Sequence, residues 1–408
     1  MRRYLQFDGS RIQVGGKIFE VGNGSVYLVG VGKASIKMGI EAAEILAGVI
    51  NKGILISKDV DDPFRPTLPD PVELFFASHP VSDARGIEAT HAIVEMLEDA
   101  SDEDYVICLI SGGASALLTH PIIPLADWQM LVKTLLESGC SINELNSVRR
   151  QIDTVKGGGL LEYAAPAAWV SLILSDVVGN PLEVIGSGPT VRFDDKPDAA
   201  RQVLKRYSID EVLPDGVWNR VDEALIAIEG KEPPKVEPAL NFIIGDIRRA
   251  AVAAESAADE MGFSTQLLTC HLEGEAREVG KFAASMARDL EPGSCLLLGG
   301  ETTVTVRGDG LGGRNQELAL SAAIALDGVE NVVVASFATD GEDGPTKAAG
   351  AYATGSTCQE ARDAGVDPQD FLNNNDSNSF FSQLGGLLST GATGTNVNDL
   401  LFIIKYDS

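Results

Sequence analysis

Residues 299–320 read GGETTVTVRGDGLGGRNQELAL, a strand-turn-helix pattern that is typical of α/β proteins. The β-branched run at 302–306 predicts a strand, and a helix is expected to begin near Asn315. The glycines between them are Gly308, Gly310, Gly312 and Gly313. Glycine lets a ligand approach the backbone closely, and the first N–H groups of a helix have no internal partner. The pattern therefore predicts an anion-binding turn with Arg314 and Glu317 at its mouth.

The same glycines also match the dinucleotide-binding pattern G-x-G-x-x-G, which follows a strand and precedes a helix. That pattern is completed by an acidic residue about 20 residues further on, at the end of the next strand. The next strand is expected at 332–338, and Asp340 after it lies too far along. A phosphate-binding turn is therefore preferred to a nicotinamide site.

The composition bounds the class of protein. With 408 residues and 44% hydrophobic content, the chain is long enough for two α/β domains. A net charge of −27 repels phosphate backbones, so we expect no nucleic-acid partner. No apolar run approaches the roughly 18 residues of a membrane span, and the first residues carry no apolar signal core. Five scattered cysteines without a C-x-x-C pair indicate a reduced, cytoplasmic protein with no membrane partner.

Strand and helix patterns alternate on both sides of a charged, proline-rich segment at 229–238. This alternation indicates sheets covered by helices, and the segment is typical of a linker. We therefore predict an α/β fold with two domains, spanning 1–235 and 236–408. In the second domain, strands are expected at 240–245, 264–268, 295–298, 332–338 and 400–404.

Two apolar strands of the first half end in turns that suit a ligand. Strand 26–32 leads into Lys33, at the position where open α/β sheets bind ligands. The segment lacks the first glycine and the hydroxyl residue of a P-loop, so Lys33 is either a cation for phosphate or carboxylate, or a solvated first-turn lysine. Strand 105–111 leads into a turn that suits a cradle of backbone N–H groups for an oxyanion or phosphate. The residues of this turn are Ser111, Gly112, Gly113 and Ser115.

Other polar residues allow more than one interpretation. A helix is expected at 141–155, with Asn146 and Arg149 near one face, where they suit an anion, an oligomer contact or plain solvation. Asp176 follows a short strand and is either a catalytic carboxylate or the cap of a turn. His79 either contacts substrate or is a hydrogen-bonded structural histidine.

A dense group of acids follows the strand expected before residue 339. Asp340, Glu342 and Asp343 suit a divalent metal or a general base, and Asp340 and Asp343 are the candidate metal ligands. The sequence contains no His/Cys pairing for zinc. The polar loop before the last strand is also expected to face a ligand, through Asn396 and Asn398.

Together these motifs resemble the type II glycerate kinases, whose C-terminal part carries a MOFRL-type domain. The resemblance spans nearly the whole chain, and the motifs stand in matching order. They are GKAS at 32–35, HPVSDARG at 79–86, LISGGASALL at 109–118, NSVRRQIDTVKGG at 146–158, SLILSDVVGNPLEVIGSGPT at 171–190, the stretch at 299–320, TDGEDGPTKAAGA at 339–351, NDSNSFF at 375–381 and TGATGTNVNDL at 390–400.

The resemblance implies ATP-dependent phosphorylation of D-glycerate at its 2-hydroxyl, giving 2-phosphoglycerate and ADP, with Mg²⁺. It also implies a Rossmann-like N-terminal domain, a smaller mixed α/β C-terminal domain and an active site in the cleft between them. The catalytic residues that it implies are Lys33, Arg314, Asp176 and Asp340. Asn396 and Asn398 match polar positions of the family cleft. Together with the residues singled out above, the predicted binding residues are Ser111, Gly112, Gly113, Ser115, Arg149, Glu301, Gly310, Gly312, Gly313, Asn396 and Asn398.

Phosphoryl transfer requires positioning and neutralisation of charge, with little covalent work by the protein. We therefore expect Lys33 and Arg314 to bracket the γ-phosphate and the glycerate carboxylate. The two glycine turns are expected to supply backbone N–H groups. Asp340 or Asp176 is expected to orient Mg²⁺ or to accept the hydroxyl proton.

The chain departs from the family pattern at Ala114, Asn180, Asn378 and Ala392, where glycine, aspartate, tyrosine and proline are usual. A metal role at position 180 is thereby placed in doubt. Two other functions stay open: an NAD(P)H-dependent hydroxypyruvate reductase, supported only by the glycine pattern, and a non-catalytic, two-lobed metabolite-binding protein. A homodimer is left open as well.

Overall fold

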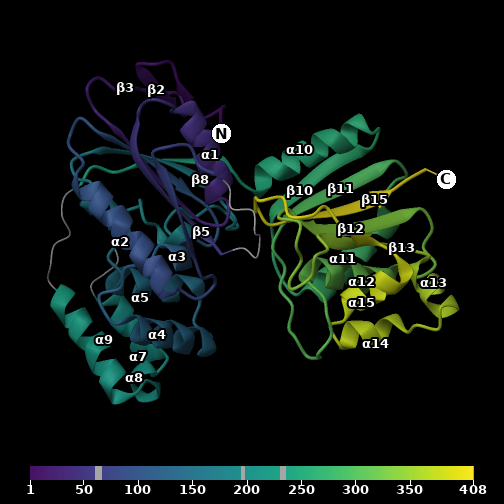
Figure 1. Cartoon of the computed structure of the whole chain (residues 1–408). Helices are drawn as coiled ribbons and strands as arrows, with labels where there is room; N and C mark the ends of the chain where they lie inside the picture. The colour runs from purple at the N-terminus through teal and green to yellow at the C-terminus, as the bar shows by residue number, and fades with distance from the viewer. Residues whose placement is uncertain (60–66, 194–197, 230–235, 408) are drawn as a thin grey trace. The chain divides into compact units, whose positions relative to one another are not determined.

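The chain forms two compact units, and the computed structural model describes residues 1–59, 67–193, 198–229 and 236–407 (Figure 1). The first unit contains Met1–Ser175 and Asn180–Ile244, and the second contains Asp176–Gly179 and Gly245–Ser408. Most of the linker expected at 229–238 falls on residues 230–235, which lie outside the described residues.

The central sheet of the first unit has the strand order β6-β5-β4-β7-β8-β9. Its strands are β4 (Val26–Val31), β5 (Ile50–Lys58), β6 (Val72–Ala77), β7 (Tyr105–Ile110), β8 (Ala168–Leu174) and β9 (Leu240–Gly245). All pairs from β6 to β8 are parallel, and β4 is buried along its whole length. Strands are added first on one side of β4 and then on the other, which is the Rossmann arrangement. Ligands bind to such sheets where the order reverses, here beyond the carboxyl ends of β4 and β7.

The strand β9 extends this sheet beside β8. The local pattern predicts residues 240–245 as a strand of the second domain, because they follow the proline-rich segment. Their position in the first sheet depends on pairing with a strand almost 70 residues earlier in the chain (β8, Ala168–Leu174), which the local pattern does not contain.

Helices surround the first sheet and form a second core beside it (Figure 1). They are α1 (Ser35–Ile45), α2 (Ala84–Glu98), α3 (Ala114–Leu117), α4 (Leu125–Glu137), α5 (Ile142–Ile152), α6 (Leu160–Tyr163), the 3₁₀ turn η1 (Ile185–Ser187), α7 (Ala199–Arg206), α8 (Ile209–Val212) and α9 (Asp215–Ile228). Apolar residues of α1 pack on the sheet, whereas α4, α5 and α7 to α9 share a separate core around Trp128. A capping box between Ser141 and Glu144 begins α5.

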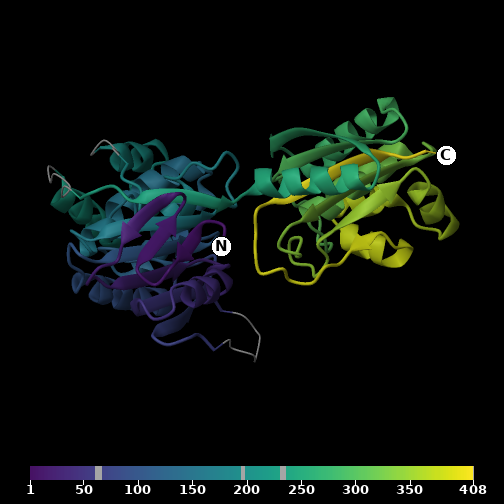
Figure 2. The same cartoon turned by 90° about the horizontal axis from the view of Figure 1, so that it is seen from above.

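A small antiparallel sheet at the N-terminus covers part of the α1 core. Its strands are β1 (Leu5–Phe7), β2 (Arg11–Val14) and β3 (Lys17–Glu20), and Figure 2 shows them as neighbouring purple arrows. Leu5, Ile12 and Val14 are fully buried in the same core as Met38 and Leu55.

The second unit is built on a mixed six-stranded sheet with the order β10-β11-β15-β12-β13-β14. Its strands are β10 (Ser264–Leu272), β11 (Ser294–Gly300), β12 (Val332–Ala338), β13 (Gly350–Thr354), β14 (Leu387–Leu388) and β15 (Asp399–Lys405). The β10–β11 pair is parallel and the other pairs are antiparallel. The predicted α/β class, with a Rossmann-like sheet followed by a mixed one, is therefore confirmed.

Both faces of the second sheet are covered, because neighbouring residues of a strand point to opposite faces. Leu297 packs with α10, whereas Leu298 packs with α11 and α12. The helices are α10 (Ile247–Glu260), α11 (Ala276–Asp289), α12 (Arg314–Leu326), α13 (Thr357–Asp363), α14 (Pro368–Asn373) and α15 (Ser377–Leu384). Among the described residues of both units, no helix is long and apolar enough to cross a membrane.

The strand predicted at 302–306 is wrong. The strand β11 ends at Gly300, and the β-branched run that follows forms only an isolated bridge between Thr303 and Glu275. A β-branched run forms a strand when a neighbouring strand pairs with it, and here the chain has already left the sheet. The run lies along the start of α11 instead, where Thr305 bonds to the Glu275 carboxylate at 2.8 and 3.1 Å.

Candidate functional site

The first group of candidate residues lies beyond the carboxyl ends of β4 and β7. The backbone N–H of Lys33 donates to Gly112 O at 2.8 Å, which joins the two strand-end turns. The hydroxyl of Ser111 accepts from Ala34 N at 3.1 Å and donates to the last residue of β4 at 3.4 Å. Gly32 has φ +121°, and a Cβ there would overlap the Ser111 hydroxyl, so this close approach requires glycine. Ser111 therefore positions the Lys33 turn, and its single hydrogen is not left for a ligand.

His79 and Lys33 lie on either side of Gly113. A Cβ at Gly113 would lie 3.1 Å from His79 Cδ2 and 3.3 Å from Lys33 Cγ. Burial, with the charges of Lys33 and Lys58, lowers the pKa of His79 to about 4. The imidazole is therefore neutral at pH 7, beside the Lys33 side chain.

The turn after β7 offers backbone donors, as predicted. In the described part of the chain, the N–H groups of Gly112, Gly113 and Ser115 have no hydrogen-bond partner, whereas Ala114 N donates to Ser111 O. Three N–H groups beside a lysine are a suitable environment for phosphate oxygens.

A chain of hydrogen bonds links α5 to this turn. Arg149 Nη1 donates to Ser115 Oγ at 3.0 Å, and Ser115 Oγ lies 2.6 Å from Ser187 Oγ. Ser187 Oγ donates in turn to Asn146 Oδ1 at 2.9 Å. Lys156, which is 2% exposed, donates to Ser115 O at 2.7 Å and also to Leu118 O. Burial lowers the pKa of Lys156 to about 8. The structure thus brings the predicted residues Ser115 and Arg149 together.

The second group of candidates lies at one edge of the second sheet, around Arg314. Its guanidinium donates to Asp399 through Nε at 2.5 Å and Nη2 at 2.9 Å, and to Glu301 through Nη1 at 2.8 Å. Asn398 Nδ2 donates to the other Glu301 oxygen at 3.2 Å. Burial acts to lower the pKa of Arg314, but the carboxylates of Asp399 and Glu301 outweigh it and raise the pKa above its usual value. Three predicted residues, Arg314, Glu301 and Asn398, are therefore in direct contact.

The N-terminus of α12, which is predicted to bind an anion, already binds a carboxylate of the chain itself. The carboxylate of Asp343, which is 1% exposed, accepts from Asn315 N and Nδ2 at 3.1 and 3.2 Å. It also accepts from Gln316 N and Nε2, both at 2.9 Å. A carboxylate has about four acceptor positions, and all four are used. We therefore assign Asp343 to the cap of α12, in place of the predicted metal ligand.

The glycine turn at 308–313 is packed against the segment 374–377. The N–H groups of residues 307–311 donate to the backbone or side chains of Asn374, Asn375 and Asp376. Cβ atoms at its glycines would overlap residues 374–377 or Asp343. The glycines thus permit close chain packing, and the expected supply of N–H groups is limited to Gly312 and Gly313, which have no partner in the described ranges.

Glu317, predicted at the mouth of the glycine turn, is instead buried and bonded to other residues of the second unit. It is 2% exposed, accepts from Arg277 Nε at 2.9 Å and accepts from Asn375 Nδ2 at 2.7 Å. Above it is a cavity of about 590 Å³, a size that suits a small ligand. The cavity is lined by Glu301, Thr302, Thr303, Val304, Val306, Gly310, Gly312, Gly313, Arg314, Glu317, Gly344, Pro345 and Asn375.

Asp340 lies at the end of β12, on the sheet edge that also holds Asp399. Its Oδ1 accepts from Glu342 N at 3.1 Å, and its Oδ2 has no partner in the described residues. Asn396 Oδ1 accepts from Asn398 N at 3.0 Å, which shapes the loop before β15. Asp176 is partly buried and belongs to the second compact unit.

Two residues of these groups were missed by sequence reasoning. Asp399 stands at the first position of β15, directly opposite Gly300 and Ala338, and only that pairing brings it to Arg314. Ser187 lies in η1 and meets a turn 72 residues earlier in the chain. The segment around Ser187 is rich in glycine and proline and contains no local signal for this contact.

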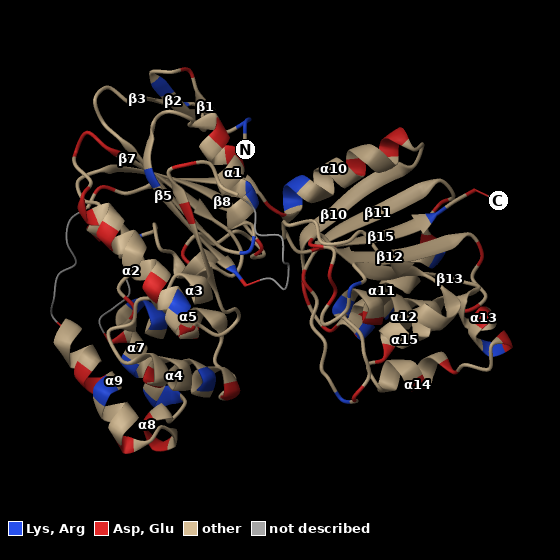
Figure 3. Ribbon diagram, in the orientation of Figure 1, with Lys and Arg blue, Asp and Glu red and all other residues tan. Residues whose placement is uncertain are grey.

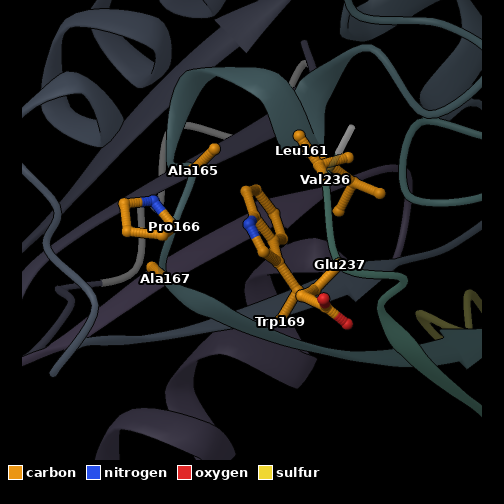
Figure 4. Close-up of a pocket in the computed structure, with 7 residues that line it drawn as sticks. All are labelled: Leu161, Ala165, Pro166, Ala167, Trp169, Val236 and Glu237. Carbon is orange, nitrogen blue, oxygen red and sulfur yellow. The ribbon is translucent and has the colours of Figure 1, made fainter. Parts of the chain in front are cut away.

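A further cavity of the first unit lies at the other end of its sheet. It measures about 290 Å³ and is lined mainly by apolar residues around Trp169, at the start of β8 (Figure 4). Ligands of parallel sheets bind at the carboxyl ends of strands, so this cavity is not part of the Lys33 group.

Comparison with known proteins identifies the family. Residues 1–222 match the family model described as "Domain of unknown function (DUF4147)", and residues 294–399 match the MOFRL family. A protein of Thermotoga maritima named D-glycerate 2-kinase is 41% identical, covering 92% of this chain and 89% of the relative. This chain belongs to the glycerate kinase family.

A crystal structure named as glycerate kinase from the same organism has a TM-score of 0.86 at 40% identity and covers 94% of this chain and 92% of that chain. A family relative from Agrobacterium vitis carries the name putative hydroxypyruvate reductase, at 36% identity over 98% of this chain and 92% of the relative. The resemblance seen in the sequence is therefore confirmed, and the two groups around Lys33 and Arg314 are the candidate sites of a glycerate kinase.

Proposed function

We propose that this chain transfers the γ-phosphate of ATP to the 2-hydroxyl of D-glycerate, giving 2-phosphoglycerate and ADP. The chain is a member of the glycerate kinase family, and the Thermotoga maritima relative and crystal structure that it resembles are named D-glycerate 2-kinase and glycerate kinase. The observation that carries the proposal is the turn after β7, where three unpartnered N–H groups lie beside Lys33 at the reversal of strand order.

The Lys33 group is suited to the phosphates of the donor. Transfer of a phosphoryl group is accelerated mainly by fixed positive charge and by N–H groups aimed at the phosphate oxygens. Lys33 supplies the charge, and Gly112, Gly113 and Ser115 supply the N–H groups. The neutral imidazole of His79 adds no competing charge to this position.

The Arg314 group supplies a second cation, held in a fixed orientation. Asp399 accepts from Nε and Nη2 of the guanidinium, and the remaining nitrogen, Nη1, donates to Glu301. Arg314 and Glu301 both line the 590 Å³ cavity. We propose that Arg314 and Asp340 act in the reaction, Arg314 on negative charge of the substrates and Asp340 as acceptor of the hydroxyl proton or as metal ligand.

Mg²⁺ fits this chemistry through few protein ligands. The described residues contain no cluster of three side chains that could hold a metal, but Mg²⁺ commonly uses one or two carboxylates together with waters and substrate phosphates. Asp340 has a carboxylate oxygen without a partner and is the residue that would bind it. When bound, Mg²⁺ neutralises charge on the donor phosphates.

A coupled assay of ADP release tests the proposal. With ATP, Mg²⁺ and D-glycerate, ADP is expected to appear in step with phosphorylated product, and phosphorus NMR is expected to identify 2-phosphoglycerate. Product that is 3-phosphoglycerate would contradict the assigned position, and absence of glycerate-dependent ADP release would contradict the kinase.

The reductase name of the relative from Agrobacterium vitis gives a second candidate. A nicotinamide dinucleotide would need free N–H groups in the turn at 308–313, yet those of residues 307–311 are already donated to residues 374–376. Incubation with NADH and hydroxypyruvate is therefore expected to leave the NADH absorbance unchanged, and steady oxidation would favour the reductase. A metabolite-binding protein without catalysis is tested by the same ADP assay.

A further inference from the structure

The four side chains Asn146, Arg149, Ser115 and Ser187, here called the Arg149 cluster, form an ordered relay of hydrogen bonds. Asn146 and Arg149 are three residues apart on α5 and so share one face of the helix. Ser187 uses its hydrogen on Asn146 Oδ1, so it must accept from Ser115 at 2.6 Å. Ser115 in turn accepts from Arg149 at 3.0 Å. The direction of each hydrogen bond in the relay is thereby fixed.

In the described part of the chain, N–H donors of Arg149 and Asn146 remain without a hydrogen-bond acceptor. A guanidinium carries five N–H donors, and the described residues accept from Arg149 at one position only, Ser115 Oγ. Asn146 is only 1% exposed, and its Nδ2 is buried and has no partner in the described part of the chain. A buried donor without an acceptor costs free energy, so Asn146 Nδ2, beside a guanidinium with only one described bond, indicates that a ligand rich in acceptors binds there.

The charge of the cluster is also unbalanced. No carboxylate of the described residues lies within ion-pair distance of Arg149. Asp153, four residues further along the chain, has its oxygens occupied by Thr119 Oγ1, His120 N and Val155 N. Arg149 is partly buried, and the buried cation of Lys156 contacts the backbone of Ser115 beside it. In the ribbon of Figure 3, blue marks Lys and Arg near the α5 label, in a chain whose net charge is −27. Cations shielded from water are normally paired, so two of them without a described carboxylate partner favour an anion as the ligand.

The cluster lies next to the position assigned to the transferred phosphate. Ser115 follows Gly113 by two residues, a Cβ added at Gly113 would lie 3.3 Å from Lys33 Cγ, and Lys33 N donates to Gly112 O at 2.8 Å. The same short turn therefore contacts Lys33 on one side and Arg149 on the other. A small acceptor molecule can reach both from one bound position.

We propose that the Arg149 cluster binds the carboxylate of the acceptor acid. This inference rests on the proposed function for the identity of that acid, D-glycerate. The planar fork of a guanidinium matches the two oxygens of a carboxylate, and the amide of Asn146 supplies a further donor. The fork of Arg314 is less suitable, because Asp399 already occupies two of its nitrogens. The turn N–H groups and Lys33 remain for phosphate.

The test uses direct binding as well as turnover. Calorimetric titration of the full-length protein with D-glycerate is compared with titration with glycerol, which lacks the carboxylate. Arg149→Lys keeps the charge and removes the fork, and Asn146→Asp keeps the size and introduces a repelling charge. Each variant is expected to raise the Kd and KM for D-glycerate about 10- to 100-fold, with the KM for ATP unchanged. The preference for glycerate over glycerol is expected to fall by the same factor.

The matched control is Arg206→Lys, an exposed arginine of the same unit that pairs with Glu144. It is expected to bind D-glycerate as the wild type does. Thermal unfolding of every variant separates loss of binding from loss of folding. If both variants are folded and bind D-glycerate like the wild type, or if they weaken ATP instead, the inference is overturned.

The outcomes distinguish this inference from the proposed function. Arg149-dependent binding of D-glycerate without ADP release would refute the kinase and uphold the carboxylate site. Normal phosphorylation of glycerate by both folded variants would uphold the kinase and refute the carboxylate site. A wild-type protein that binds no D-glycerate would refute both.

Discussion

Replacing Asp343 with alanine is expected to destabilise the second unit strongly, because its carboxylate is the only cap of α12 in the described structure. The change removes the acceptor for Asn315 N, Asn315 Nδ2 and Gln316 N, while Gln316 Nε2 keeps its bond to Thr346 Oγ1 at 2.9 Å. Asn315 and Gln316 are 1% and 0% exposed, so water does not readily replace the carboxylate.

Three buried donors without an acceptor cost about 1 to 3 kcal/mol each, and the space left by the side chain lets some of them relax. The expected loss in the free energy of unfolding is therefore about 3 to 5 kcal/mol, which includes the loss of the cap. Asp343→Asn is expected to lie between the alanine variant and the wild type, because one oxygen is kept. Urea unfolding followed by far-UV circular dichroism measures the loss, and hydrogen exchange at residues 314–326 locates it.

The control for this prediction is Asp289→Ala, an exposed aspartate at the end of α11, which is expected to change stability by less than about 0.5 kcal/mol. The reasoning would be refuted by an Asp343→Ala protein that is as stable as the wild type. If that protein also needed more Mg²⁺ for turnover, Asp343 would be a metal ligand after all.

Three other predictions follow from the two groups. Lys33→Ala is expected to lower kcat for glycerate phosphorylation about 10²- to 10³-fold with little change in stability, measured by ADP release and thermal unfolding; retained turnover would remove Lys33 from the reaction. Asp399→Asn is expected to lower kcat more than it raises either KM, because it removes the negative charge and one of the two oxygens that orient Arg314. Unchanged kcat would contradict the positioning role. The depressed pKa of His79 means that the unfolded chain binds more protons between pH 6.5 and about 4, so stability falls as pH falls through this window. His79→Gln is expected to flatten that decline in urea unfolding, and an identical pH profile would contradict it.

The part of the fold that could be predicted is the part that local patterns specify. The strand before Lys33 and the strand before Gly112 are continuous apolar runs, which parallel strands buried on both faces require. Their glycine turns mark where each strand ends. The Rossmann order then brings Lys33 and Gly112 together, so a site at this edge followed from the sequence.

Contacts between distant segments could not be predicted. The bonds of Asp343 to α12 span about 28 residues, and those of Ser187 to Ser115 span 72. The acids at 340–343 have the same local composition whether they cap a helix or bind a metal. Likewise, residues 302–306 have β-branched side chains in either environment, and only the departure of the chain from the sheet at Gly300 decides against a strand.

The three arginines of the candidate regions show why partners, and not residue type, assign a role. Arg277 is 9% exposed and shares Glu317 with Asn375, so its charge is fully used in packing. Arg314 is held by Asp399 and Glu301 but remains partly exposed beside a cavity. This arrangement suits a cation whose orientation is fixed before an anionic ligand binds. Arg149 is partly buried, donates to Ser115 Oγ and has no anionic partner among the described residues. A cation taken partly out of water is stabilised by an anion, so we expect the partner of Arg149 to arrive with the substrate.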